Sequence, residues 1–283
     1  MLYRLDGGVG GAEETLALAG YRGSRPVRIG NGAAEQTQLD IYGDYLQTAW
    51  LYQRAGGSID TDTGRRLAEI AELVCRTWRE PDSGIWEVRS QPVHFTQSKM
   101  MCWIALDRAA RLADDSHIPA SGVDHWRAEA AAIREFVEHH CWSERLTSYT
   151  RFAGSDELDA SLLLAAVMDY DAPVDRLDCT ITAIRRELGH GPLLYRYSGE
   201  DGLGGPEGSF VCCSFWLAQA LARAGRVDQA AELMAELIGL ANDLGLYAEE
   251  IEPNTGEFLG NLPQGLVHLA LINAASAIEE VQR

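Results

Sequence analysis

Two kinds of helical pattern alternate along most of the sequence, and this alternation limits the possible folds more than any other feature. In one kind the apolar residues fall on a single face, as Leu67, Ile70 and Val74 do, which is typical of a half-buried surface helix. The other kind is apolar on nearly every side, as in residues 99–106 and 210–217, and such helices are buried. Buried helices that alternate with half-exposed ones predict an inner ring of helices wrapped by an outer ring, an all-α toroid.

The periodicity predicts nine helices, at residues 33–54, 62–80, 97–113, 123–142, 157–169, 175–188, 208–224, 227–242 and 263–281. No strand pattern is long enough to build a competing sheet, and no linker interrupts residues 1–283, so a single domain is expected. An α/α toroid closes with an even number of helices, usually twelve. The sequence therefore predicts an incomplete (α/α)6 toroid, with about three helices upstream of Met1 and an open side through which the chain could self-associate.

Charge and cysteine content argue against several classes of partner. The chain has 24 basic and 42 acidic residues, a formal net charge of −18. This charge repels phosphate backbones and anionic headgroups, so neither nucleic acid nor membrane is expected as a partner. Six cysteines without a CxxC pair favour a reducing compartment. Because Met1–Asp6 does not read as a signal peptide, a cytoplasmic location is expected.

The segment Glu80–Arg89 is the first candidate for chemistry. Asp82 and Gly84 are typical of a turn, and this turn would separate Trp86 and Glu87 from the preceding helix. An aromatic neighbour can remove water from a carboxylate, and that environment suits a general acid. The same residues also fit a surface glutamate in a short extended segment.

Three further polar segments lie before, or at the start of, predicted buried helices. Tyr247–Gly256 carries Glu249 and Glu250, and alone it fits an acidic loop in solvent. Gly191–Tyr197 places Arg196 between two tyrosines, which suits either a sugar hydroxyl or a structural loop. The polar residues of Asn31–Asp40 either line a wet cavity or cap neighbouring loops, because a buried helix tolerates few unpartnered polar groups.

Several common site chemistries lack their motifs. The glycine-rich segment Gly202–Gly208 follows no predicted strand and precedes no GK[ST], so it does not predict a phosphate loop. His139 and His140 are adjacent, and no His/Cys/Asp cluster has zinc spacing. No GxSxG nucleophile motif is present. We therefore expect neither a metal nor another cofactor, and no serine nucleophile.

Several of these segments together resemble the bacterial branch of glycoside hydrolase family fifteen, which holds glucoamylases, glucodextranases and some trehalases. The resemblance covers nearly the whole chain in the family's order. Its most specific block is the Gly-Ile-Trp-Glu run that ends at Glu87, and the other matching segments are 21–31, 36–43, 94–103, 191–197 and 260–269. The resemblance implies an (α/α)6 barrel and hydrolysis of α-glucosidic bonds with inversion at the anomeric carbon.

The resemblance also implies roles for individual residues. Glu87 would be the general acid, and Glu249 the general base. The expected substrate-binding residues are Trp86, Arg89, Arg196, Tyr197 and Glu250. Inversion requires roughly 6.5–9.5 Å between the two carboxyl groups.

This sequence departs from the glucoamylase pattern at two positions that follow the implied catalytic residues. Val88 stands where many glucoamylases have a second Glu, and Glu250 stands where they have Gln. Both positions bear on the leaving sugar, which puts starch in doubt as the substrate. The family's Trp-Leu-Arg-Asp loop, which grips the outermost glucose, is absent from this sequence and is expected upstream.

The leading hypothesis is thus an exo-acting, inverting glycosidase of glucoamylase type that takes α-glucosides. A trehalase of the same family is the first alternative. A toroid that binds carbohydrate without catalysis is another, and retention of both glutamates argues against it. A terpene cyclase lacks support because the sequence has no Asp-rich metal motif.

Overall fold

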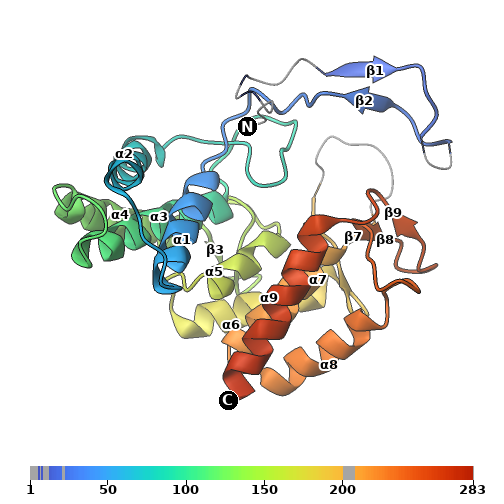
Figure 1. Ribbon diagram of the computed structural model, residues 1–283. Coiled ribbons are helices and arrows are strands. Elements are labelled where there is room, and N and C mark those ends of the chain that lie inside the picture. The colour runs from blue at the N-terminus through green and yellow to red at the C-terminus, as the bar shows by residue number, and fades with distance from the viewer. Residues whose placement is uncertain (1–5, 7, 9–12, 21–22, 200–207, 283) are drawn as a thin grey trace.

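A computed structural model describes residues 6, 8, 13–20, 23–199 and 208–282. Within this part of the chain, nine α-helices and one short 3₁₀ helix account for most of the regular structure (Figure 1). The helices are α1 (Ile41–Arg54), α2 (Thr61–Thr77), α3 (Thr96–Asp114), α4 (Val123–His140), α5 (Leu164–Val167), α6 (Val174–Leu188), α7 (Val211–Arg223), α8 (Val227–Ile238) and α9 (Gly265–Gln282), with η2 (Ala160–Leu163) leading into α5. None of the described helices is long and apolar enough to cross a membrane.

Burial divides the helices as the sequence predicts. In α3 sixteen of nineteen residues are buried, and in α7 twelve of thirteen are. In contrast, α2 buries one stripe that includes Leu67, Ala71 and Val74, because its other face carries charged residues that remain in water. The inner helices α3 and α7 pack against both their sequence neighbours and other inner helices, since α1 lies on α3 and α9 lies on α7.

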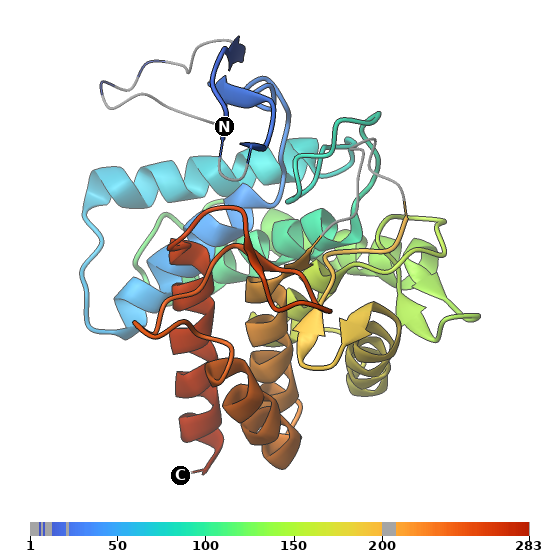
Figure 2. The same cartoon turned by 90° about the vertical axis from the view of Figure 1, so that its right-hand side faces the viewer.

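Strands are short and confined to the connections. The hairpin of β1 (Glu14–Leu16) and β2 (Val27–Ile29) stands above the helices in Figures 1 and 2. The remaining strands are β3 (Trp142–Ser143), β4 (Ser148–Tyr149), β5 (Gly189–His190), β6 (Leu193–Leu194), β7 (Ser209–Phe210), β8 (Glu250–Ile251) and β9 (Phe258–Leu259). The last three form an antiparallel sheet in the order β7-β8-β9. This sheet joins the loop before α7 to the loop before α9.

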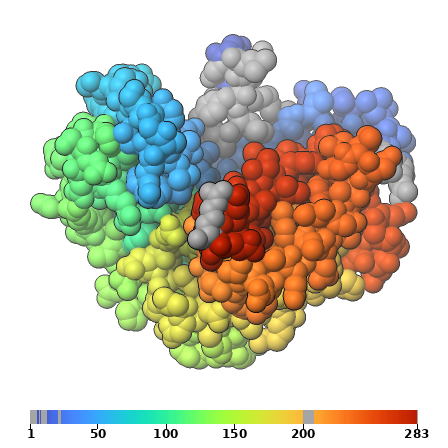
Figure 3. All heavy atoms as spheres, turned by 60° about the horizontal axis from the view of Figure 1, so that its bottom comes forward, coloured from blue at the N-terminus to red at the C-terminus, as the bar shows by residue number. Residues whose placement is uncertain are grey.

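The first and last inner helices are not buried on every side. On α1, Tyr45 is 54% exposed and Tyr52 55%, while on α9 Leu269 is 60% exposed and Ile272 56%. A hollow of about 780 Å³ between α1 and α2 is lined by both tyrosines together with Ile59 and Leu67. Figure 3 shows the base of the molecule, with blue residues of the α1–α2 region on one side of the C-terminus and red and orange residues of α9 and α8 on the other. Both helices thus expose apolar side chains, as an open side of the ring requires.

Two predicted helices are shorter than expected. The helix predicted at 33–54 begins only at Ile41, because the backbone N–H of Leu39 donates to the Asp82 carboxylate (3.0 Å) instead of continuing a helix. The helix predicted at 157–169 is reduced to η2 and α5, since Asp159 caps Ser161 and starts a 3₁₀ turn. The sequence of residues 1–6 also reads as the end of a strand, and apart from Asp6 this segment lies outside the described residues.

Candidate active site

The loop between α2 and α3 is fastened at its base by two buried charged residues. Asp82 accepts hydrogen bonds from the backbone of Leu39, at 3.0 Å, and from the hydroxyl of Ser98, at 2.7 Å. Lys99, the single lysine of the sequence, donates from Nζ to the carbonyl oxygens of Trp78 and Glu80, both at 2.6 Å. Burial raises the pKa of Asp82 and lowers that of Lys99. The loop therefore starts from a fixed position against α1 and α3.

Glu87 lies at the tip of this loop in an unusual backbone conformation. Its φ of 53° is in the left-handed region, which costs a non-glycine residue about 1–2 kcal/mol. Such strained backbone conformations are concentrated at functional sites. Asn31 donates from Nδ2 to Glu87 Oε2 at 2.9 Å. The Asn31 amide is itself oriented, because its Oδ1 accepts the backbone N–H of Ala33 at 2.8 Å. One oxygen of the half-buried carboxylate is thus held by a neutral donor.

Trp86 belongs to an aromatic cluster at the mouth of the inner helices. Its ring centroid lies 5.5 Å from that of Phe210, 6.0 Å from that of Trp216 and 6.3 Å from that of Tyr197. The guanidinium carbon of Arg196 lies 5.6 Å from the Trp86 ring centroid, within cation–π range. Aromatic faces beside a cation suit a sugar ring with its hydroxyls, so the cluster has the chemistry of a sugar-binding surface.

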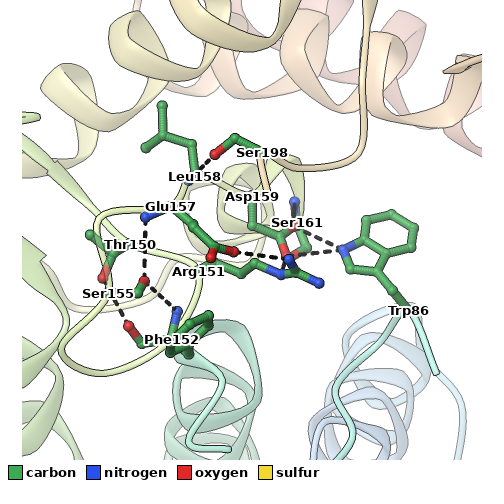
Figure 4. A network of polar contacts seen from close by, with 10 residues as sticks. All are labelled: Trp86, Thr150, Arg151, Phe152, Ser155, Glu157, Leu158, Asp159, Ser161 and Ser198. Carbon is green, nitrogen blue, oxygen red and sulfur yellow. Dashed lines mark hydrogen bonds and ion pairs between the residues drawn. The ribbon is translucent and has the colours of Figure 1, made fainter. Parts of the chain in front are cut away.

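The indole nitrogen of Trp86 is held by the carboxylate of Asp159. Nε1 donates to both oxygens of Asp159, at 2.9 and 3.0 Å (Figure 4). Asp159 is 2% exposed, and its burial raises its pKa. The cluster is therefore tied to the segment that precedes η2.

The second glutamate loop meets the first through the β7-β8-β9 sheet. The backbone N–H of Val211 donates to the carbonyl of Glu249 at 3.1 Å, and Phe210, which contacts Trp86, pairs with Glu250. Glu249 Oε2 accepts the backbone N–H of Asn261 at 3.1 Å and its side-chain amide at 2.9 Å. Gly260 has φ of 70°, and a Cβ there would lie 2.7 Å from Glu249 Oε2, so glycine is needed beside this carboxylate.

Glu250 has a different environment from Glu249. Burial raises its pKa, as does the negative charge of Glu249, while the charge of Arg196 opposes the rise. A Cβ at Gly208 would lie 2.9 Å from Glu250 Oε2, so this side chain fills the space next to the backbone. Arg196 and Glu249 thus influence the charge of Glu250 in opposite directions.

Most of the predicted site residues therefore share one end of the inner helices. Two of them, Trp86 and Tyr197, belong to the aromatic cluster. Arg196 lies over the Tyr197 ring, and Glu250 pairs with Phe210 of the cluster, so the loops of Glu87 and Glu249 are joined through it. Arg89 instead contacts Glu13 and Asn31, and Asn31 is the residue that holds Glu87. Arg89 is 3.5 Å from Glu13 Oε2 and 3.4 Å from Asn31 Oδ1, which joins the β1–β2 region to the loop of Glu87.

The polar stretch before α1 supports the loop of Glu87, which is the second of the two roles the sequence left open. Gln36 donates to the carbonyl of Val88 at 2.9 Å, in addition to the Asn31 contact described above. Residues 200–207, which include most of the predicted glycine-rich segment, lie outside the described residues. Among the described residues no group of three or more His, Cys, Asp or Glu side chains could hold a metal ion.

Sequence reasoning missed Asp159, Asn261 and the cluster members Phe210 and Trp216. Asp159 carries one available signal, since an aspartate two residues before a serine at the start of an apolar run is typical of a helix N-cap. Phe210 and Trp216 belong to a segment that is apolar on every side, and this pattern does not indicate which residues face the mouth.

Asp40, a buried carboxyl at the start of α1, should make the stability of the chain depend on pH. It is 7% exposed, and burial together with the charge of Asp82 raises its pKa to about 7. The folded chain therefore binds the proton more tightly than the unfolded chain, so the free energy of unfolding falls as pH rises from about 4 to about 7. We expect Asp40→Asn to reduce this fall, since the raised pKa of Asp44 leaves part of it, and to be more stable than wild type near pH 8 by on the order of 3 kcal/mol. Urea unfolding near pH 5 and near pH 8 measures both, and parallel pH profiles would refute the assignment.

Comparison with known families gives one match along almost the entire chain. Residues 3–276 match the family model described as glycosyl hydrolases family 15. Similar curated proteins include a trehalase of Mycolicibacterium smegmatis, 46% identical over 94% of this chain and 41% of its own length. A trehalase of Thermoplasma acidophilum is 37% identical over 99% of this chain and 48% of its own length. The chain thus spans somewhat less than half the length of these relatives.

Solved structures show the same fold at low sequence identity. A glycosidase matches 91% of this chain and 72% of its own chain, with a TM-score of 0.75 at 20% identity. A bacterial glucoamylase complexed with acarbose matches 86% of this chain and 41% of its own, with a TM-score of 0.70 at 17% identity. The mostly helical arrangement therefore corresponds to part of the (α/α)6 toroid of such glucoamylases.

Proposed function

Because the chain belongs to glycosyl hydrolases family 15, we propose that it carries the acid–base pair of an inverting α-glucosidase of the trehalase type. The observation that carries this proposal is the meeting of two glutamate loops at one end of the inner helices. The Trp86 ring contacts the Phe210 ring, and the residue after Phe210 is hydrogen-bonded to Glu249. Residues far apart in sequence thus supply two carboxylates and an aromatic floor to one place.

Glu87 and Glu249 take complementary roles in this proposal. Glu87 donates a proton to the glycosidic oxygen as the C1–O bond breaks, and Glu249 accepts a proton from the water that attacks C1 from the opposite face. Asn31 holds Glu87 Oε2, so the proton would be delivered from Oε1. Both hydrogen bonds from Asn261 fall on Glu249 Oε2, which assigns the attacking water to Oε1 of that residue.

Trehalose is the preferred substrate among α-glucosides. The similar curated proteins named above are trehalases, which supports the trehalase alternative over the glucoamylase hypothesis. The residues that follow Glu87 and Glu249 also favour trehalose over starch. Val88 is 4% exposed, and an apolar buried side chain cannot bind a sugar hydroxyl there. Glu250 adds a carboxylate, within the electrostatic influence of Arg196, at the position where many glucoamylases have a neutral amide.

Glu250→Gln tests the substrate assignment. This change removes a negative charge beside the aromatic cluster but keeps the shape of the side chain, and a hydrogen bond to a charged group contributes about 1.5–3 kcal/mol. We expect kcat/KM for trehalose to fall about 10- to 100-fold, with a smaller fall for maltose. Rates of glucose release from trehalose, maltose and soluble starch, measured for wild type and variant, give the ratio. A wild type that prefers starch, or a variant that loses both disaccharides equally, would contradict the proposal.

We further propose that additional helices complete the ring and the sugar site. The exposed apolar faces of α1 and α9 support this, as does the greater length of the relatives. Activity is to be measured on this chain together with the helices that complete its ring, which we call the ring-closed protein.

A further inference from the structure

Asp159 is a buried carboxylate that the acid–base mechanism does not use. It lies in the connection between β4 and η2, and 2% of its surface is exposed. No substrate could reach it without displacing Trp86, whose indole N–H covers both of its oxygens at 2.9 and 3.0 Å. A carboxylate at such depth is costly unless it is well paired, so its partners indicate what it does.

These partners link the loop of Glu87 to the segment of Arg196 and Tyr197. Besides Trp86, Asp159 accepts the backbone N–H of Ser161 at 2.8 Å. Its Oδ2 lies 3.9 Å from Nε of Arg151, which is 4% exposed. The Arg151 guanidinium in turn lies 3.8 Å from the centroid of the Tyr197 ring. Figure 4 shows the Asp159 carboxylate next to both the Trp86 indole and the Arg151 guanidinium.

The backbone strengthens the same connection. Asp159 and Tyr197 form an isolated antiparallel bridge, and the N–H of Ala160 donates to the carbonyl of Arg196 at 2.7 Å. On the other side of the loop, Arg151 Nη1 is 3.0 Å from Glu157 Oε2. The contacts with Ser161, Arg151 and Tyr197 therefore fix the carboxylate of Asp159. The position of the Trp86 indole in turn depends on this carboxylate.

We propose that Asp159 is a positioning residue that acts through Trp86, fixing the indole against the sugar-binding cluster and thereby the placement of the adjacent Glu87. The inference rests on the proposed function. Glu87 has a strained φ of 53°, so the loop relies on tertiary contacts to hold it, and the Trp86 indole is the neighbouring anchor. Displacement of a catalytic group by about 1 Å can cost about 10²-fold in rate.

Asp159→Asn tests this role with little change of volume. If the Asn oxygen accepts from Ser161, the Asn NH₂ group replaces the oxygen 3.0 Å from the indole nitrogen, so two donors face each other and the indole keeps only the acceptor at 2.9 Å. We expect kcat on trehalose to fall about 10- to 100-fold while KM changes less than about threefold, because the loss is in placement of the acid. Asp156→Asn is the matched control, since Asp156 lies in the same loop but is exposed and bonds Ser143 and Arg145.

Two further measurements separate positioning from general damage. In proton–nitrogen NMR spectra, Asp159→Asn should shift the Trp86 indole N–H signal, which Trp86→Phe identifies by its loss. The indole signals of Trp78 and Trp126, which donate to Glu129 and Glu72, should remain unchanged and serve as internal controls. In a Trp86→Phe background, Asp159→Asn should lower kcat by no more than about twofold, because residues that act through one contact are not additive.

The possible results point in different directions. An active protein whose kcat stays within about twofold after Asp159→Asn, or falls equally in the Trp86→Phe background, overturns the positioning role. If Asp159→Asn fails to fold, Trp86→Phe alone must reproduce the loss of kcat, and unchanged turnover overturns the role as well. A ring-closed protein without α-glucosidase activity contradicts the proposed function instead, while the NMR shift still reports the Asp159–Trp86 contact.

Discussion

Replacing Glu87 or Glu249 by glutamine is expected to lower trehalose hydrolysis by on the order of 10²–10⁴-fold in the ring-closed protein. Glutamine keeps the hydrogen bonds from Asn31 and Asn261, both of which fall on Oε2, but it can neither donate an acidic proton nor accept one from water. The free energy of unfolding should change little, because partly exposed loop carboxylates contribute little to stability. Initial rates of glucose release and urea unfolding of each variant measure the two effects.

Matched controls lie in the same loops. Glu80 precedes Glu87 in its loop and Glu257 follows Glu249 in its loop, and both are exposed. Glu80→Gln and Glu257→Gln should retain turnover within about twofold, as is usual for exposed sites outside the reacting geometry. Near-wild-type turnover of Glu87→Gln or of Glu249→Gln would show that the role of that residue is wrongly assigned, and the base would then be sought at Glu250.

The isolated 283-residue chain is expected to hydrolyse trehalose at least about 10²-fold more slowly than the ring-closed protein. Without the closing helices one side of the sugar site is open, so the glucosyl unit is not held in line between the two glutamates. The exposed Tyr45, Tyr52, Leu269 and Ile272 form apolar faces that favour association with a second copy. We therefore also expect the isolated chain to self-associate as its concentration rises.

Both expectations can be tested on purified protein. Sedimentation velocity over a concentration series reports self-association, and substitution of Leu269 and Ile272 by Gln should reduce it. Glucose release by the monodisperse chain is then compared with release by the same chain extended with the part of the M. smegmatis relative that it does not cover. Equal turnover by the two forms would refute the need for ring closure.

Helix positions could largely be predicted from the sequence because periodicity reports burial. The predicted helices at 97–113 and 175–188 correspond to α3 (Thr96–Asp114) and α6 (Val174–Leu188). The error at residues 33–40 has a tertiary cause: the Asp82 carboxylate, far along the chain, takes the N–H of Leu39 that a helix would have used. A local pattern contains no information about such a partner.

The site was predictable only in part for a similar reason. Glu87 and Glu249 were identified because their loops carry recognisable motifs, and the structure joins these loops through Trp86 and Phe210. Asp159 could not be assigned to Trp86 from the sequence, since 73 residues separate the two. Its role depends on a hydrogen bond and on burial, neither of which has a sequence signature beyond the N-cap.

Proton NMR of the glucose first released from trehalose tests the central claim most directly. In an inverting reaction water replaces the leaving sugar from the opposite face, so each trehalose gives one β-glucose and one α-glucose. The account predicts equal initial amounts of the two anomers before mutarotation mixes them. Initial release of α-glucose alone would indicate a covalent intermediate, which requires carboxyl groups only about 5–5.5 Å apart, and would contradict the assignment of Glu249 as a general base.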